Sequence, residues 1–160
     1  MTSRSAALYE EDFYAWTREQ AAALRRLAAE HWNGPLDLEH LAEEVEDLGK
    51  EQRNAVRSQL RRIIEHRLKL AYSPAAAPRP GWLDSIDDAR AEIEDRMTAT
   101  IRREVEAALP RLYAQVLPKV ARTLESFGER EAAARLPERC PWTLDELLSA
   151  PPEDDLDRRP

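Results

Sequence analysis

The sequence contains little of two residue types that shape small folds, cysteine and glycine. Among 160 residues there are four glycines and one cysteine, Cys140. A single cysteine excludes an internal disulfide and is typical of a protein of the reducing cytoplasm. Few glycines and few β-branched residues, beside many Ala, Leu, Arg and Glu, favour helices over sheets. We therefore expect an all-α, cytoplasmic protein.

Long apolar runs and an excess of positive charge are absent as well. No stretch approaches the ~20 apolar residues that a membrane-spanning helix needs. The first residues, MTSRSAALYEEDFYAW, do not follow the order of a secretion signal. The net charge is -7, and a field of that sign repels anionic membranes and nucleic acids. We expect no membrane partner, and nucleic acid is disfavoured.

What the sequence does contain is apolar residues at three- and four-residue steps, the pattern of amphipathic helices. The pattern predicts helices at about residues 10–31, 37–72, 82–109 and 111–127, with a short piece at about 129–136. Thr143 and Glu146 form the signature of a capping box that opens a short last helix. The expected fold is a helical bundle of about four principal helices, with a long second helix and a short C-terminal helix. We expect a single domain over residues 1–150, followed by a disordered acidic, proline-containing tail at 151–160.

The second predicted helix is the most informative one. Its apolar residues, including Leu41 and Leu48, keep one phase across Gly49, which could otherwise be a C-cap that divides the helix. An unbroken helix is favoured because a break would normally reset the phase. Within the same apolar arc lie three polar residues, Gln52, Gln59 and His66.

These three polar residues predict a seam with hydrogen-bonding partners. A buried amide without a partner costs about 1–3 kcal/mol, so each group should find a hydrogen bond or lie at a boundary. The commonest use of polar residues in a helical seam is to fix register or partner. The helix is also acidic over residues 37–47 and mainly basic over 50–69. Because an antiparallel copy would place acid against base, we expect a homodimer or another protein as partner.

An enzyme is the alternative. His40, Glu44 and Asp47 lie at helical spacing, and His66 could join them in a divalent metal site. Glu44, His66 and Lys69 are the candidates for acid–base or nucleophilic chemistry. However, acids in the first turns of a helix stabilise its dipole without any further function, and a lysine is usually exposed. We therefore expect no cofactor, and a non-enzymatic interaction module remains the leading hypothesis.

Nucleic-acid binding is the third hypothesis. Arg53, Arg57 and Arg61 form a basic row at four-residue steps. The row lacks interleaved aromatic residues, a glycine-rich loop and any known nucleic-acid motif, so it carries less weight than the other two hypotheses.

Four ordered stretches resemble a known family: YEEDFYAWTREQAAALR, LDLEHLAEEVEDLGKEQRNAV, IIEHRLKLAY and CPWTLDELL. They are similar to a bacterial family catalogued as domain of unknown function 29, over Tyr9 to about Leu148. The resemblance implies an all-α cytoplasmic domain and implies no activity. The chain differs from the family pattern at Lys50 and Glu51, where a serine often follows the glycine, and at Ala71 and Tyr72, near an expected tryptophan.

Overall fold

The structure is a computed structural model that describes residues 4–152. Over this range the chain forms seven helices and no strand, which confirms the all-α fold: α1 (Arg4–Glu11), α2 (Phe13–Ala29), α3 (Leu38–Tyr72), α4 (Arg79–Arg96), α5 (Ala99–Ser126), α6 (Arg130–Ala134) and α7 (Leu144–Leu148). Beyond residue 152 the predicted disordered tail lies outside the described residues. None of the described helices is both long enough and apolar enough to cross a membrane.

The helices group into two compact units. We call the first the hairpin unit; it comprises residues up to Ala55 together with Arg96–Glu104. The second, the bundle unit, comprises Val56–Asp95 and the chain from Val105 onward. Helices α3 and α5 each contribute to both units. The expectation of one domain over residues 1–150 stays a prediction.

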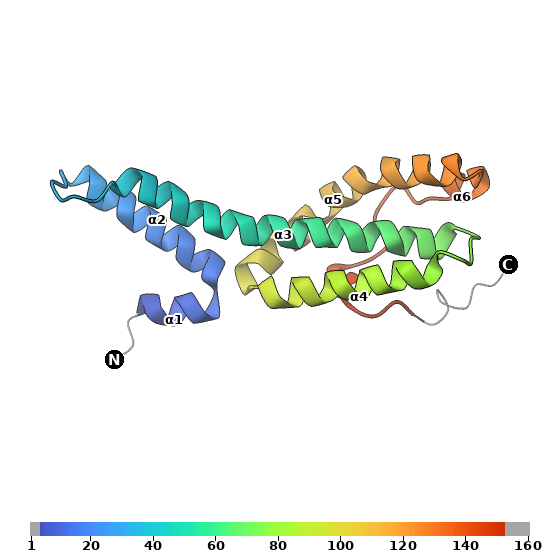
Figure 1. The fold of residues 1–160 in the computed structure, drawn as a ribbon, viewed down its shortest axis with the longest axis horizontal. Coiled ribbons are helices and arrows are strands. Elements are labelled where there is room, and N and C mark those ends of the chain that lie inside the picture. Colours follow the sequence, from blue (N-terminus) through green and yellow to red (C-terminus); the bar gives the residue numbers. More distant parts are fainter. Residues whose placement is uncertain (1–3, 153–160) are drawn as a thin grey trace. The chain divides into compact units, whose positions relative to one another are not determined.

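In the hairpin unit, α2 and the first half of α3 lie side by side and run in opposite directions (Figure 1). The first predicted helix is divided at Asp12, so a single helix from residue 10 to 31 is wrong. The Asp12 carboxylate accepts hydrogen bonds from the backbone N–H groups of Ala15 and Thr100, both at 2.9 Å. Burial acts to raise the pKa of Asp12, but these bonds together outweigh it and hold the pKa below its usual value. Asp12 therefore caps α2 and also holds the start of α5.

The bundle unit has the larger apolar core. Three helices contribute rows of buried side chains. The row of α3, in its second half, is Val56, Leu60, Ile63, Ile64 and Leu68. The row of α4 is Ile86, Ala89 and Ile93, and that of α5 is Val105, Tyr113, Val116 and Val120. Leu144 and Leu147 of α7 are buried too. The predicted capping box is confirmed, because Thr143 Oγ1 accepts from the Glu146 N–H and the Thr143 N–H donates to Glu146 Oε2.

The predicted boundary between the third and fourth helices is wrong. The break lies at Met97 and Thr98, where Thr98 Oγ1 accepts a hydrogen bond from the Ile101 N–H at 3.2 Å. Pro110, which we expected to end or bend the third helix, lies inside α5, and Pro118 lies inside it as well. Each proline is exposed, and so are the residues four positions before them. Water can therefore satisfy the backbone carbonyls that lose their N–H partners, which lowers the cost of each proline.

Candidate interaction site

Gly49 sets the contact between α2 and α3. It lies within an unbroken α3, so the prediction of one continuous helix is confirmed. A Cβ at this position would lie 2.1 Å from Thr17 Oγ1 and 3.1 Å from Tyr14 Cδ2. The glycine is therefore needed for the close approach of α2 and does not act as a helix terminator. Thr17 is fully buried, and its hydroxyl donates to the Tyr14 carbonyl at 2.8 Å.

This contact decides which side of α3 faces solvent in the hairpin unit. Leu38, Ala42 and Gly49 form the buried face. Leu41 and Leu48, which we expected on the apolar core face, are instead 40% and 49% exposed. The sequence prediction for these two leucines is wrong because α2 packs against the face that contains Gly49 and leaves the face with the two leucines exposed.

Two acids complete the exposed face. Leu41, Glu44, Leu48 and Glu51 follow one another at steps of three and four residues, and all four are exposed; we call this row the α3 ridge. Neighbouring acids are paired, since Glu46 accepts from Arg25 Nη2 at 2.6 Å and Asp47 accepts from Lys50 Nζ at 3.0 Å. Glu44 has no such partner among residues 4–152. The ridge thus presents two leucines with an uncompensated carboxylate between them.

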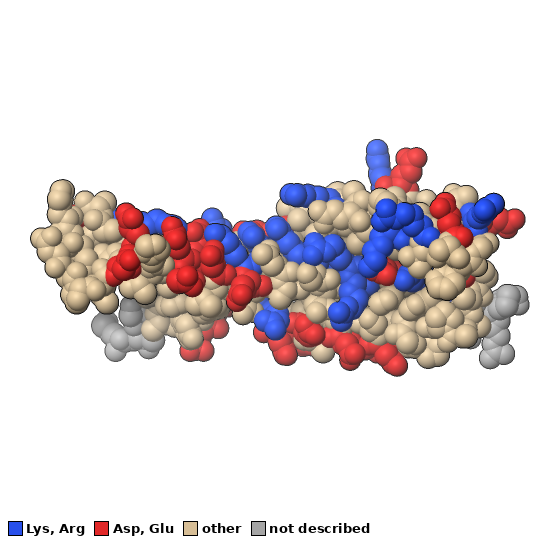
Figure 2. Space-filling model, turned by 45° about the horizontal axis from the view of Figure 1, so that its top comes forward, with Lys and Arg blue, Asp and Glu red and all other residues tan. Residues whose placement is uncertain are grey.

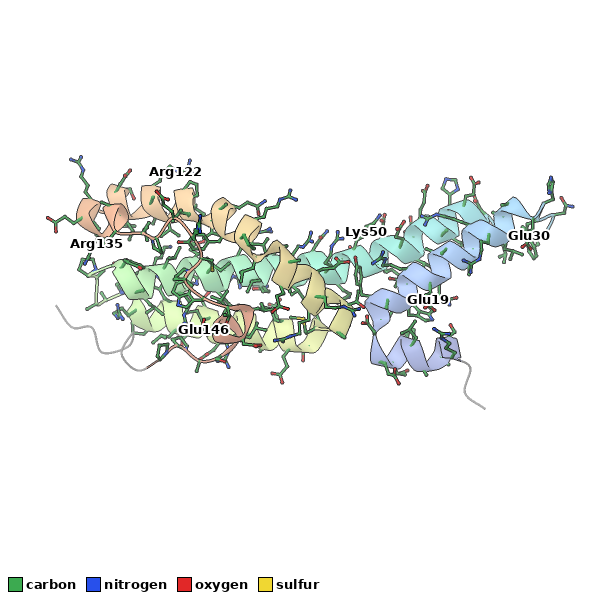
Figure 3. The ribbon with its side chains drawn as sticks, turned by 180° about the vertical axis from the view of Figure 1, so that it is seen from behind. Glu19, Glu30, Lys50, Arg122, Arg135 and Glu146 are labelled. Carbon is green, nitrogen blue, oxygen red and sulfur yellow. The ribbon has the colours of Figure 1, made fainter. Side chains whose placement is uncertain are left out.

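The tip of the hairpin adds more apolar surface. Leu27, Trp32 and Leu36 are 38%, 42% and 54% exposed. The Trp32 indole is packed on Gly34, where a Cβ would lie 2.1 Å from Cζ2 of the ring. On the face that Figure 2 shows, no charged side chain lies at the tip and acidic side chains gather on the adjoining part of α3; the exposed Glu30 also lies at the tip (Figure 3). Exposed aromatic and leucine side chains next to charge are typical of protein-binding surfaces.

The candidate metal ligands do not assemble. His40 Nδ1 lies 2.6 Å from Asp37 Oδ2, and this hydrogen bond raises the pKa of the histidine. Asp47 is paired with Lys50, Glu44 is exposed, and His66 belongs to the other unit. Across the part of the chain that the structure describes, no group of three or more His, Cys, Asp or Glu side chains could hold a metal ion.

The polar seam has its partners within the chain. Gln52 Oε1 accepts from Arg96 Nη1 at 3.0 Å, and Gln59 Nε2 donates to Glu92 Oε2 at 2.7 Å. Both partners lie on α4, so each glutamine links α3 to α4 within the chain, and their predicted role in fixing register stays a prediction. Two atoms of the seam, Gln59 Oε1 and His66 Nδ1, are buried and have no hydrogen-bond partner among the described residues. Burial lowers the pKa of His66, and the nearby Glu65 only partly opposes this.

Beside His66, in the bundle unit, lies a second polar group. Glu65 accepts from Lys69 Nζ at 2.8 Å through one oxygen and from Lys119 Nζ at 2.7 Å through the other. Burial acts to raise the pKa of Glu65, but the two lysines outweigh it and lower the pKa. The candidate nucleophile Lys69 is thus held in an ion pair. In the predicted basic row, Arg53 donates to the Tyr14 hydroxyl at 3.3 Å and Arg61 donates to Ser58 Oγ at 3.1 Å.

Arg67 is a residue whose role the sequence reasoning missed. It is 2% exposed, and its guanidinium lies 5.1 Å from the centre of the Trp142 ring. A cation over an indole face is a favourable arrangement that fastens the C-terminal segment to the bundle unit. The signal was present, because Arg67 continues the steps of three and four residues from Leu60, Ile63 and Ile64.

The chain resembles known proteins in both sequence and fold. Residues 8–151 match the family model described as "Domain of unknown function DUF29". A crystal structure of an α-helical protein of unknown function from Rhodospirillum rubrum is similar, with a TM-score of 0.80 and 24% identity. The match covers 95% of this chain and 98% of that one, and it supports the fold. No curated protein matches the chain.

Proposed function

Because the chain belongs to the DUF29 family, whose description assigns no activity, we propose from its geometry that it is a non-enzymatic protein-interaction module. The observation that carries the proposal is the α3 ridge. Leu41 and Leu48, seven residues apart, are about half exposed with Glu44 between them. This is the spacing at which one helix receives another along a seam.

The apolar part of the ridge supports binding energetically. Fully burying a leucine side chain contributes about 1.5–3 kcal/mol, so covering the exposed half of each leucine contributes about 1 kcal/mol. Trp32 and Leu36 at the hairpin tip offer further apolar area. Since α2 packs tightly against the opposite face at Gly49, the ridge is held in place before binding, which reduces the entropy cost of association.

The acids of the ridge indicate the kind of partner. In an antiparallel pair of identical ridges, setting Leu41 against Leu48 of the second copy brings the two Glu44 carboxylates together. A shift by one turn sets leucine against glutamate instead. Both registers are unfavourable. The ridge is better suited to an amphipathic helix of another protein, with apolar residues one heptad apart and Lys or Arg between them.

Two synthetic helical peptides test this proposal, one built from leucine and lysine and the other from leucine and glutamate. In fluorescence anisotropy, the leucine–lysine peptide is expected to bind and the leucine–glutamate peptide to bind far more weakly. Glu44→Lys should lower the affinity for the leucine–lysine peptide about tenfold, equivalent to about 1.4 kcal/mol. Glu19→Lys is the matched control, because Glu19 is an exposed acid of α2 and its reversal changes the net charge equally (Figure 3).

Two results would contradict the proposal. Equal weakening by Glu44→Lys and Glu19→Lys would mean that the peptide responds only to net charge. Unchanged binding in Leu41→Ser/Leu48→Ser would mean that the leucines take no part. Light scattering of the same variant tests the homodimer expected from the sequence. A wild-type dimer that the double substitution dissociates would assign the ridge to a second copy of the chain in place of a basic partner.

A further inference from the structure

A pocket in the bundle unit is not used by the ridge or by the proposed interaction. It has a volume of about 380 Å³ and lies between the second half of α3 and α5. Its polar lining consists of the side chains Ser58, Arg61, Arg62, Glu65, His66, Gln115 and Lys119, and Val116 supplies an apolar wall. The size is within the range of small-molecule sites. Figure 2 shows lysine and arginine side chains gathered on one face of this unit.

The charge balance of the pocket favours an anion. Its acid, Glu65, has both oxygens occupied by Lys69 and Lys119. Among residues 4–152, Arg61 bonds only neutral groups, donating to Ser58 Oγ at 3.1 Å and, weakly, to Gln115 Oε1 at 3.5 Å. No acid of residues 4–152 lies within ion-pair distance of Arg62. Two guanidinium groups therefore line the pocket without a carboxylate of their own.

The other donors match the oxygens of a phosphate group. Two arginines offer planar forks of N–H donors, Lys119 a point charge, and Ser58 and Gln115 neutral donors. A terminal phosphate has three oxygens and carries close to two charges, whereas a carboxylate has two oxygens and one charge. His66 lines the same wall, with its Nδ1 buried and without a hydrogen-bond partner among the described residues.

We propose that this pocket binds the phosphate group of a small phosphomonoester, held by Arg61, Arg62 and Lys119. The rest of the ligand lies against Val116. A nucleic acid could offer the same phosphate chemistry. The protein's net charge of -7 disfavours such a polyanion, because it repels every phosphate that lies outside the pocket.

Isothermal titration of the full chain with inorganic phosphate, glycerol 3-phosphate and ribose 5-phosphate, at constant ionic strength, tests the proposal. Saturable binding of at least one phosphomonoester is expected. Arg61→Gln/Arg62→Gln should weaken it at least tenfold. Arg135→Gln, at the exposed end of α6 and outside the pocket, should leave it within twofold (Figure 3). Circular dichroism checks that each variant is folded, and ligand-induced shifts of the Gln115 side-chain amide and the His66 ring in NMR spectra locate the site.

Several outcomes would overturn the proposal. One is the absence of saturable binding by the wild-type chain. Others are equal affinity for sulfate or chloride, or unchanged affinity in Arg61→Gln/Arg62→Gln. Binding of a 5′-phosphorylated oligonucleotide, without binding of the free monoesters, would replace the small-molecule ligand with nucleic acid.

Discussion

Replacing Gly49 with alanine is expected to destabilise the protein, although alanine is the better helix former. In a helix interior, alanine is favoured over glycine by about 1 kcal/mol. Against this, the new Cβ would lie 2.1 Å from Thr17 Oγ1 and 3.2 Å from Thr17 Cβ. Thr17 must move, and its buried hydroxyl then loses the 2.8 Å bond to the Tyr14 carbonyl.

The magnitude follows from these competing effects. Overpacking costs about 1–3 kcal/mol, and a lost buried hydrogen bond adds about 1 kcal/mol. After the gain in helix propensity, Gly49→Ala should lower the free energy of unfolding by about 1–3 kcal/mol. For a chain of this length the melting temperature should fall by roughly 2–12 °C. Amides of α2 should lose hydrogen-exchange protection before those of the bundle unit.

The matched control is Gly81→Ala in α4, where a Cβ would have no atom within 4 Å. That variant should be neutral or more stable, by up to about 1 kcal/mol. In a Thr17→Ala background, Gly49→Ala should lose most of its cost, giving a coupling of at least about 1 kcal/mol in a double-mutant cycle. If Gly49→Ala raises the melting temperature as Gly81→Ala does, the close-approach argument is refuted.

Three further predictions concern single side chains. In NMR titrations the pKa of His40 should lie above about 6.5 and the pKa of His66 below it. Because the pKa of His66 is lowered in the folded protein, the stability that depends on it is present above pH 6.5 and is lost as the pH falls. A pKa of His66 above that of His40 would refute the prediction. Glu65→Gln should lower the free energy of unfolding by about 1 kcal/mol at pH 7, measured with urea. Since the pKa of Glu65 is lowered from 4.5, the difference in unfolding free energy between variant and wild type should shrink below that pH. A difference that does not change with pH would contradict the ion pairs of Glu65 with the two lysines. Thr143→Ala should cost about 1 kcal/mol by removing a helix cap and should speed proteolysis near α7, whereas Ser149→Ala, which removes no N-cap, serves as the control.

The sequence predicted the continuity of α3 and the capping box at Thr143 because both depend on local chemistry. An apolar phase that persists through a glycine, and a Thr-x-x-Glu pattern, can be recognised within a few residues. The break at Thr98 had a local signal as well, since threonine is a common N-cap. The prediction placed the break at Pro110 instead, because proline usually ends a helix. Pro110 lies inside α5 because the backbone carbonyl that loses its N–H partner there is exposed to water.

The candidate site was harder to predict because it depends on which face of α3 is covered. Leu41 and Leu48 look like core residues in a helical projection. Only the packing of α2 against Ala42 and Gly49 leaves them outside. The phosphate pocket depends on Lys119 and Gln115 of α5 meeting Arg61, and such contacts distant in sequence leave no local pattern.

The dual role of Asp12 has a consequence for how the chain can be divided. Its carboxylate holds the first turns of α2 and α5 together, and Tyr14 similarly donates to Glu104. A fragment that stops at residue 55 would lack Thr100 and Glu104, leaving both side chains without these partners. The hairpin unit therefore cannot be expressed or grafted as one continuous stretch of sequence. A fragment that keeps these contacts must also include Arg96–Glu104.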